Sequence, residues 1–395
     1  MALTYRTAGE SHGPALFALV EGLPAGLPLT PADIDTDLAR RQLGYGRGGR
    51  MKIETDRAEV KSGLRHGRTI GSPLTMEIVN RDFANWAADR MSIWALEDGV
   101  SVDPITLPRP GHADLAGMLK YASDDLRPIL ERASARETAA RVAAGGIAKA
   151  LLRRYGMEVR SHVTIIGGVA APERPELTLA DFDGVDESPV RCLDPEASEK
   201  MRAEVKAAGQ SHDTVGGIFE VWVFDPLPGL GSHVSGDARL DGRLAQALMG
   251  IQAIKAVEVG DGLETTRRRG SAAHDELHLR DGRIVRETDR AGGIEGGMTT
   301  GQVLRVRAGM KPIATVPNAL PTIDVASGEE AKAHHQRSDV SAVPAAGVVA
   351  EAMTALVLAD AVLEKFGGDS LAETRRNLEG YLAAIPETLA TAIES

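Results

Sequence analysis

Hydrophobic and polar positions follow a helical period in two segments of the chain. In the first, Ser134 and Glu137 match the S-x-x-E capping box of a helix start, and Glu137 and Arg141 form a favourable i,i+4 pair. The opposite face is apolar and comprises Ala139, Ala143, Ile147 and Ala150. This pattern predicts a helix that begins near Ser134 and ends near Gly156.

The second segment, residues 343–366, is more apolar. Pro344 in the expected first turn and Gly367 just past the last turn are typical of the two ends of a helix. The interior is apolar on most sides, so we predict a central, buried helix. The segment also carries Glu351 and Asp360, whose charges would be costly in a bilayer, which argues against a membrane span.

Shorter apolar runs predict strands at residues 218–224 and 302–306, and a hairpin around the Asp281-Gly282 turn. No fixed-period repeat and no linker divides the chain. The polar stretch at residues 82–110 is expected to be an excursion or a mobile loop, and that at 170–210 a peripheral elaboration. We therefore predict one integrated domain over residues 1–395, with loop insertions.

The composition indicates a globular, cytoplasmic protein. The 395 residues include one cysteine, Cys192, which excludes an intramolecular disulfide and a multi-cysteine zinc site. The N-terminus lacks the charged start and apolar run of a signal peptide. A formal net charge of −11 argues against non-specific binding to nucleic acids or membranes, although a local arginine cluster can still attract a small anion.

Two tempting patterns lack the features that their chemistry needs. His274 and His278 are four residues apart, but the alternation around them predicts a strand, in which they would lie roughly 13 Å apart, too far to share a metal ion. Gly229 and Gly231 miss the spacing of a dinucleotide-binding loop. The chain also lacks a P-loop and a G-x-S-x-G elbow, so we predict no metal site and expect any phosphate to be bound by other means.

Two loop segments combine glycine with titratable side chains. His12 lies between glycines in GESHG, where backbone N–H groups can approach an anion. His112 and Asp114 are two residues apart, so the carboxylate can orient the imidazole, and Arg109 adds a fork suited to phosphate or carboxylate. A solvated turn and a surface ion pair are the simpler alternatives for these segments.

Two further arginine groups would suit an anion, and an aspartate could act on protons. Arg132 and Arg136 flank a helix start, where N–H groups attract anions, although the same turn could serve only as a cap. Asp339 could be a base or a cap. The run RRQLGYGRGGR at residues 40–50 spaces four arginines with glycines, which favours polyanion capture. Together these segments indicate an enzyme that acts on a small, multiply anionic, phosphorylated substrate with a phosphate-bearing cofactor.

Taken in order, these motifs resemble those of the chorismate synthase family. The matching stretches run over almost the whole chain and are TAGESHG (7–13), RRQLGYGRG (40–48), RPGHADLAGMLKY (109–121), RASARETAARVAAG (132–145), MGIQAIKAVEVGDG (249–262), AGGIEGGMTTGQ (291–302), MKPIATVP (310–317) and HQRSDVSAVPAAG (335–347). Eight stretches in family order argue strongly against a chance match.

The resemblance implies an α+β fold, a β-α-β sandwich with helices between two mostly antiparallel sheets, in a homotetramer. It implies reduced FMN as cofactor and a 1,4-anti elimination of phosphate from 5-enolpyruvylshikimate 3-phosphate. The product is chorismate, with no net redox change, at the end of the shikimate pathway. NADPH or an external flavin reductase would supply the electrons. An NADPH-consuming flavin reductase and a non-catalytic phospho-ligand binding protein are the alternatives.

The resemblance also implies roles for individual residues. His12 matches the histidine that manages protonation of the reduced flavin, His112 the one near the departing phosphate, and Asp339 the aspartate near flavin N5. Four arginines are expected to contact the substrate: Arg41, Arg47, Arg109 and Arg136. For Arg41 and Arg47 the resemblance also allows a contact with NADPH. The positions that fall on flavin-binding segments are Arg132, Ala133, Ser134, Gln252, Ala253, Gly296, Lys311, Pro312, Ile313, Ala314, Thr315 and Arg337.

Overall fold

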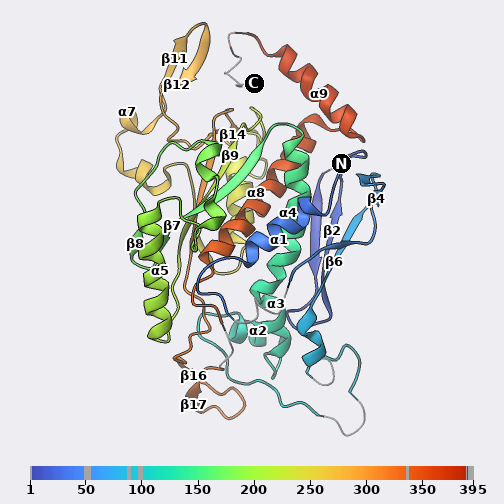
Figure 1. The fold of residues 1–395 in the computed structure, drawn as a ribbon, viewed down its shortest axis with the longest axis vertical. Helices are drawn as coiled ribbons and strands as arrows, with labels where there is room; N and C mark the ends of the chain where they lie inside the picture. The colour runs from blue at the N-terminus through green and yellow to red at the C-terminus, as the bar shows by residue number, and fades with distance from the viewer. Residues whose placement is uncertain are drawn as a thin grey trace.

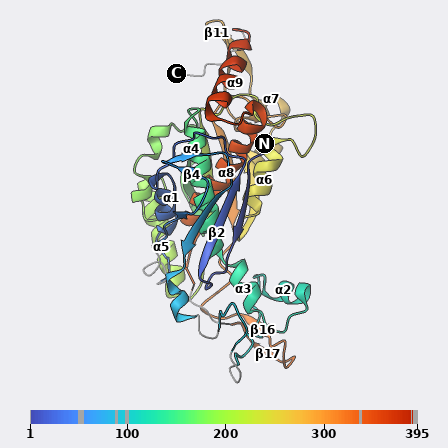
Figure 2. The same cartoon turned by 90° about the vertical axis from the view of Figure 1, so that its right-hand side faces the viewer.

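Two antiparallel sheets enclose a layer of helices in the computed structural model (Figure 1). The structure describes residues 2–48, 55–86, 90–96, 101–334, 338–387 and 389. Seen from the side, the N-terminal strands lie across one face of the helices (Figure 2). The predicted α+β sandwich of helices between two antiparallel sheets is therefore confirmed.

The first sheet has four antiparallel strands. Their order is β1 (Thr4–Ala8), β2 (Ala15–Glu21), β6 (Leu74–Val79) and β3 (Glu59–Val60). Every second residue of β6 is buried, which is the period expected of a strand that turns one face to a core.

The second sheet has five antiparallel strands and a more deeply buried centre. Their order is β10 (Ile254–Val259), β15 (Leu304–Met310), β9 (Gly217–Phe224), β7 (Glu158–Ile166) and β8 (Val169–Ala170). Strands β9 and β15 confirm the two predicted strands. The outer face of β9 is covered by Phe182 from the polar stretch at residues 170–210, which packs with Trp222 and Phe224.

Four helices carry most of the packing between and beside the sheets. They are α1 (Ala32–Gln42), α4 (Thr138–Arg153), α6 (Leu240–Met249) and α8 (Val343–Phe366). Helix α8 confirms the predicted central helix and packs on α4 on one side and on β7 and β9 on the other. It is long and apolar enough to cross a membrane, but 89% of its most apolar window is buried inside the protein, so it is core.

The start of α4 differs from the prediction. Ser134 caps the 3-10 turn η3 (Ala135–Glu137), and α4 itself begins at Thr138. The predicted capping box is wrong because the Glu137 carboxylate does not turn back to the cap; it pairs with Arg141 at 2.9 Å. The Glu137–Arg141 pair is confirmed.

Two consecutive glycines let α4 approach its neighbours closely. A Cβ atom on Gly145 would lie 2.2 Å from Ala352 Cβ of α8, and one on Gly146 would lie 2.6 Å from the Asp33 carbonyl oxygen of α1. Glycine in a helix costs about 1 kcal/mol relative to alanine. The close packing of α1, α4 and α8, which these two glycines allow, offsets this cost.

A buried ionic cluster joins the same three helices. Glu351 of α8 is fully buried and bonds Arg40 of α1 at 2.7 Å and Lys149 of α4 at 2.5 Å. Arg191 also reaches Glu351, at 3.2 Å. Burial would raise the pKa of Glu351, but these cations hold it well below its ordinary value. The cluster fixes the C-terminal turn of α1, where the next residue, Arg41, enters the candidate site.

The remaining elements lie at the ends and outer faces. They are β4 (Leu64–Arg65), β5 (Arg68–Thr69), η2 (Arg81–Asn85), α2 (Asp114–Tyr121), α3 (Arg127–Ala133), η4 (Leu179–Phe182), η5 (Val185–Glu187), α5 (Pro195–Gln210), η6 (Gly262–Arg267), α7 (Gly270–Ala273), β11 (Leu277–Arg280), β12 (Arg283–Arg286), β13 (Ile294–Glu295), β14 (Met298–Thr299), β16 (Pro321–Ile323), β17 (Glu330–Lys332) and α9 (Leu371–Ala384). Strands β11 and β12 pair around Asp281-Gly282, so that predicted hairpin is confirmed.

The close helix packing predicts a cost for adding one methyl group. Gly145→Ala should lower the free energy of unfolding by about 1–3 kcal/mol, because overpacking outweighs the better helix propensity of alanine. The matched control is Gly380→Ala in α9, where a Cβ would have no neighbour within 4 Å. That variant should be roughly 0.5–1 kcal/mol more stable than the wild type. Denaturant unfolding measures the free energy of unfolding of both variants, and equal stability of the two would contradict the packing argument.

Candidate active site

His12 lies in the turn between β1 and β2, held against α3. The turn begins at Gly9, whose φ of 99° brings its Cα so close to Ala15 that a Cβ would lie 2.3 Å from the Ala15 carbonyl oxygen. The backbone N–H of Ser11 donates to the Glu131 carbonyl oxygen at 3.1 Å. The glycines therefore let the turn fold back tightly on α3.

The His12 imidazole is 6% exposed and has a carboxylate partner. Its Nδ1 lies 2.9 and 3.0 Å from the two oxygens of Glu131. Burial would raise the pKa of Glu131, but hydrogen bonds from His12 and Arg127 outweigh burial and lower it. The Trp86 ring covers His12, with 4.0 Å between the ring centroids.

His112 forms a second histidine–carboxylate pair. Its Nδ1 lies 2.5 Å from Asp114 Oδ1, so the pairing predicted from the two-residue spacing is present. Arg109 donates to the same carboxylate at 2.8 Å and to Thr315 Oγ1 at 2.9 Å. Burial would raise the pKa of Asp114, but the bonds from His112 and Arg109 hold it well below its ordinary value. The His112 side chain keeps 20% of its surface exposed, so a ligand can reach it.

Arg41 and Arg136 share one buried carboxylate, that of Asp56. The distances from their guanidinium groups to Asp56 are 3.3 and 2.5 Å. Arg136 also donates to Asn80, whose amide donates in turn to the Gly13 carbonyl oxygen next to His12. Burial and the neighbouring arginines Arg136 and Arg47 lower the pKa of Arg41 to about 10. Two guanidinium groups held so close together would attract an anion.

Asp339 joins the same region through the glycine-rich run. Its carboxylate accepts the Gly48 N–H at 2.6 Å and pairs with Arg47 Nε at 3.1 Å. Arg41 interacts electrostatically with both Arg47 and Asp339. Electrostatic interaction with Arg41, and the hydrogen bonds of its partners, therefore link Asp339 to the turn that carries His12. Arg337, which the family resemblance places on a flavin-binding segment, lies outside the described residues.

Three of the flavin-binding segments also converge. The Ala253 carbonyl oxygen accepts the Lys311 N–H at 3.0 Å, and the Lys311 ammonium bonds the Gly111 carbonyl oxygen beside His112. Gln252 donates to Glu137 at 3.1 Å, just after residues 132–134. Within those residues, Ser134 Oγ lies 3.2 Å from Ser11 Oγ. Segments 132–134, 252–253 and 311–315 thus connect the two histidine loops.

Gly296 does not join them within one chain. It lies in the turn between β13 and β14, beyond the Leu304 end of β15, whereas Lys311 follows the opposite end of that strand. The seven residues of β15 span roughly 20 Å from one end of the strand to the other, so the separation of Gly296 from Lys311 is of this order. The other predicted flavin segments and Gly296 are therefore at opposite ends of the second sheet.

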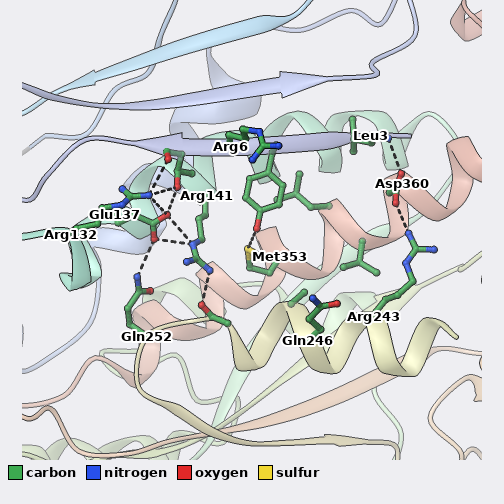
Figure 3. Close-up of a pocket in the computed structure, with 16 residues that line it drawn as sticks. Leu3, Arg6, Arg132, Glu137, Arg141, Arg243, Gln246, Gln252, Met353 and Asp360 are labelled. Carbon is green, nitrogen blue, oxygen red and sulfur yellow. Dashed lines mark hydrogen bonds and ion pairs between the residues drawn. The ribbon is translucent and has the colours of Figure 1, made fainter. Parts of the chain in front are cut away.

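A cavity of about 710 Å³ lies next to these residues, between β1, α6 and α8 (Figure 3). Arg132, Glu137, Arg141 and Gln252 gather at one end of it. Its lining does not include His12, His112 or Asp339, so the histidine pairs lie outside the cavity. We place the candidate chemistry at the histidine pairs, because there titratable groups and arginines meet, and treat this cavity as a neighbouring hollow.

Sequence reasoning missed the acidic and aromatic partners of the site. Glu131 is 119 residues from His12 in the chain, and Asp56 is 80 residues from Arg136, so no local spacing signals either contact. Trp86 falls in a stretch that the sequence describes only as polar. The one available signal for Glu131 is its place directly before the RASARE motif.

Removing the shared carboxylate should destabilise the two buried arginines that bond it. Asp56→Asn leaves Arg41 and Arg136 buried side by side, and we expect the free energy of unfolding to fall by about 3–5 kcal/mol, the usual cost of breaking a buried pair. The control Glu196→Gln breaks a solvent-exposed pair with Lys200 and should leave the unfolding midpoint unchanged. Thermal unfolding of both variants tests this, and a wild-type midpoint for Asp56→Asn would refute it.

The chain is similar to known proteins over nearly its full length. The family model described as chorismate synthase matches residues 3–363. The chorismate synthase of Leifsonia xyli subsp. xyli is 60% identical over 399 residues, which covers 98% of each chain. That of Clavibacter michiganensis subsp. michiganensis is 61% identical and covers 98% of this chain and 94% of the relative. A crystal structure of chorismate synthase superimposes with a TM-score of 0.77 at 40% identity, covering 97% of this chain and 98% of the other.

Proposed function

The chain belongs to the chorismate synthase family, lyases of the shikimate pathway that convert 5-enolpyruvylshikimate 3-phosphate to chorismate, and we propose how its own residues perform this elimination. The observation that carries the proposal is the pair of imidazoles, each bonded through Nδ1 to a buried carboxylate, beside a set of buried arginines. With Nδ1 bonded to a carboxylate, Nε2 is the atom of each ring that would exchange a proton with a ligand. This arrangement suits a reaction in which protons move while phosphate leaves.

The arginines are assigned to the anionic groups of the substrate. The substrate carries a phosphate and two carboxylates, and the buried guanidinium groups of Arg41 and Arg136 lie together at Asp56, where they would bind one of these anionic groups. Arg109 is fixed by Asp114 and Thr315 beside His112, which suits a clamp on the departing phosphate. Arg47 would contact substrate or NADPH.

His112 is assigned to the leaving phosphate. The second pKa of a phosphate ester is near 6 and that of an unperturbed histidine about 6.5, so a proton can be shared at neutral pH. The Asp114 carboxylate accepts a hydrogen bond from Nδ1–H and would stabilise the imidazolium that donates from Nε2. General-acid help of this kind is typically worth about 10²–10⁴-fold.

The family uses reduced FMN, and the residues present fit it. Gln252 Oε1 is buried and lacks a hydrogen-bond partner among the described residues, as expected of a group that awaits a ligand donor. The residues proposed to hold the flavin are those of segments 132–134, 252–253 and 311–315, with Arg337. Bound reduced FMN would supply the electron density that the breaking C–O bond needs and would regain it by the end of the turnover, so the reaction would have no net redox change.

His12 and Asp339 are assigned to proton handling on the flavin side. His12 would exchange a proton through Nε2, since Nδ1 faces Glu131. The Asp339 carboxylate, held by Gly48 and Arg47, would relay a proton near the reacting hydrogen. The covering Trp86 ring would keep water from one face of His12.

Gly296 supports the proposal of a homotetramer. If this glycine contacts flavin, a second copy of the chain must bring it, because within one chain it lies at the far end of the second sheet. We further propose that the protein is cytoplasmic and receives reduced flavin from an external reductase, with NADPH as the electron source.

Replacing His112 tests its assigned role. His112→Ala should lower turnover by about 10²-fold or more while FMN and substrate bind within a few-fold of the wild type, since the ring acts only when phosphate leaves. The control is His233→Ala, which removes an exposed histidine ahead of α6. Steady-state phosphate release and flavin titration measure both effects, and near-wild-type turnover would remove His112 from the mechanism.

An anaerobic assay tests the function as a whole. With photoreduced FMN and no NADPH, the protein should release phosphate and form chorismate over many turnovers per flavin, because no electrons are consumed. NADPH oxidation in proportion to product would instead indicate a flavin reductase. Binding of the substrate without phosphate release would indicate a non-catalytic binding protein.

A further inference from the structure

One buried carboxylate holds both the side chain and the main chain of His12. The Glu131 side chain is fully buried, and its two oxygens lie 2.9 and 3.0 Å from His12 Nδ1. One of these oxygens also accepts the backbone N–H of His12 at 2.9 Å. Nothing in the assigned roles accounts for this carboxylate.

Hydrogen-bonding chemistry determines which ring nitrogen carries the proton. An ionised carboxylate can only accept hydrogen bonds. Glu131 also accepts from Arg127 at 3.2 Å, and these donors keep it ionised despite its burial. Because Glu131 has no proton to give, Nδ1 of His12 must be the donor. In the neutral ring, Nε2 is then the basic atom.

The surroundings hold the ring in this orientation. Trp86 stacks on His12 at a tilt of 30°, so rotation of the imidazole would lose the ring contact. The charged groups that face the pair are the guanidinium of Arg127, 5.4 Å from the Trp86 centroid, that of Arg90 at 5.6 Å, and Glu10 in the same turn. Glu131 is the one whose bonds to the imidazole are described.

We propose that Glu131 is a positioning residue for the reaction, which holds His12 in the Nδ1-protonated tautomer so that Nε2 alone exchanges a proton with the bound ligand. The inference rests on the proposed function of His12. One proton is transferred in this step. Nε2 takes it from the ligand, which makes the ring a cation, or returns it, which makes the ring neutral again. The Glu131 carboxylate compensates the positive charge of the ring. No electron is transferred in this step.

The substitution Glu131→Gln distinguishes a positioning role of the side chain from a purely structural role. The bond from Ser11 N–H to the Glu131 carbonyl oxygen anchors the turn and does not depend on the side chain. The substitution Glu131→Gln keeps the size of the side chain and this backbone contact. It removes the negative charge that compensates the imidazolium, and it places an amide N–H₂ group near Nδ1 as a competing donor.

Neutron diffraction on the wild-type protein without flavin or substrate tests the tautomer directly. At a pD where the ring is neutral, we expect deuterium on Nδ1, between the ring and Glu131, and none on Nε2. Deuterium on Nε2 alone would overturn the inference. This measurement needs neither a folded variant nor an active enzyme. A contrary result would overturn only the role of Glu131, and the anaerobic assay would still test the proposed elimination separately.

Kinetics of Glu131→Gln provide the second test. Turnover should fall by about 10²-fold, the range of acid–base assistance, with KM and FMN affinity within a few-fold of the wild type. The limb of the pH profile that reports His12 should move to lower pH, because loss of the carboxylate disfavours the charged ring. The control Glu379→Gln removes a solvent-exposed acid on α9, far from this turn, and should leave the profile unchanged. An unshifted profile, or equal loss of flavin binding and turnover, would overturn the positioning role.

Discussion

Charge burial is the constraint on which the site depends. A buried cation is tolerated only when a carboxylate compensates it, and in this fold the carboxylates come from other segments of the chain. Glu131 meets His12, Asp56 meets Arg41 and Arg136, and Glu351 meets Arg40. Each pair therefore ties two parts of the fold together and sets the direction of a basic side chain at the same time.

This constraint connects the helix layer to the chemistry. The Glu351 cluster locks α1 against α4 and α8, and the last turn of α1 delivers Arg41 to Asp56. The glycine-rich run that follows then folds back so that Gly48 and Arg47 hold Asp339. A rigid centre thus supports loops that are rich in glycine, which is a common way to combine stability with close approach to a ligand.

The sequence predicted the parts of the fold that have a local signal. The apolar periodicity of residues 343–366 and the short apolar runs at 218–224 and 302–306 correspond to α8, β9 and β15. The capping box predicted at Ser134 is wrong, because the Glu137 carboxylate bonds Arg141 and the distant Thr7 and Gln252, and a 3-10 turn intervenes. The motif resemblance predicted the sandwich, which periodicity alone left open.

The site shows the same division. The pairing of His112 with Asp114 follows from a two-residue spacing. The pairing of His12 with Glu131 spans 119 residues and depends on how α3 packs under the first turn, which no local pattern encodes. The separation of Gly296 from the other flavin segments is likewise a property of the second sheet. Long-range contacts of this kind need the assembled fold.

A crystal structure of the protein with FMN and 5-enolpyruvylshikimate 3-phosphate tests the central claim most directly. That claim is that paired carboxylates aim two imidazoles and a group of arginines at one ligand. The complex should show Nε2 of both His12 and His112 within hydrogen-bonding distance of bound ligand, with Arg41, Arg109 and Arg136 on its anionic groups. Ligands seated only in the hollow between β1 and α6, out of reach of both rings, would contradict the account.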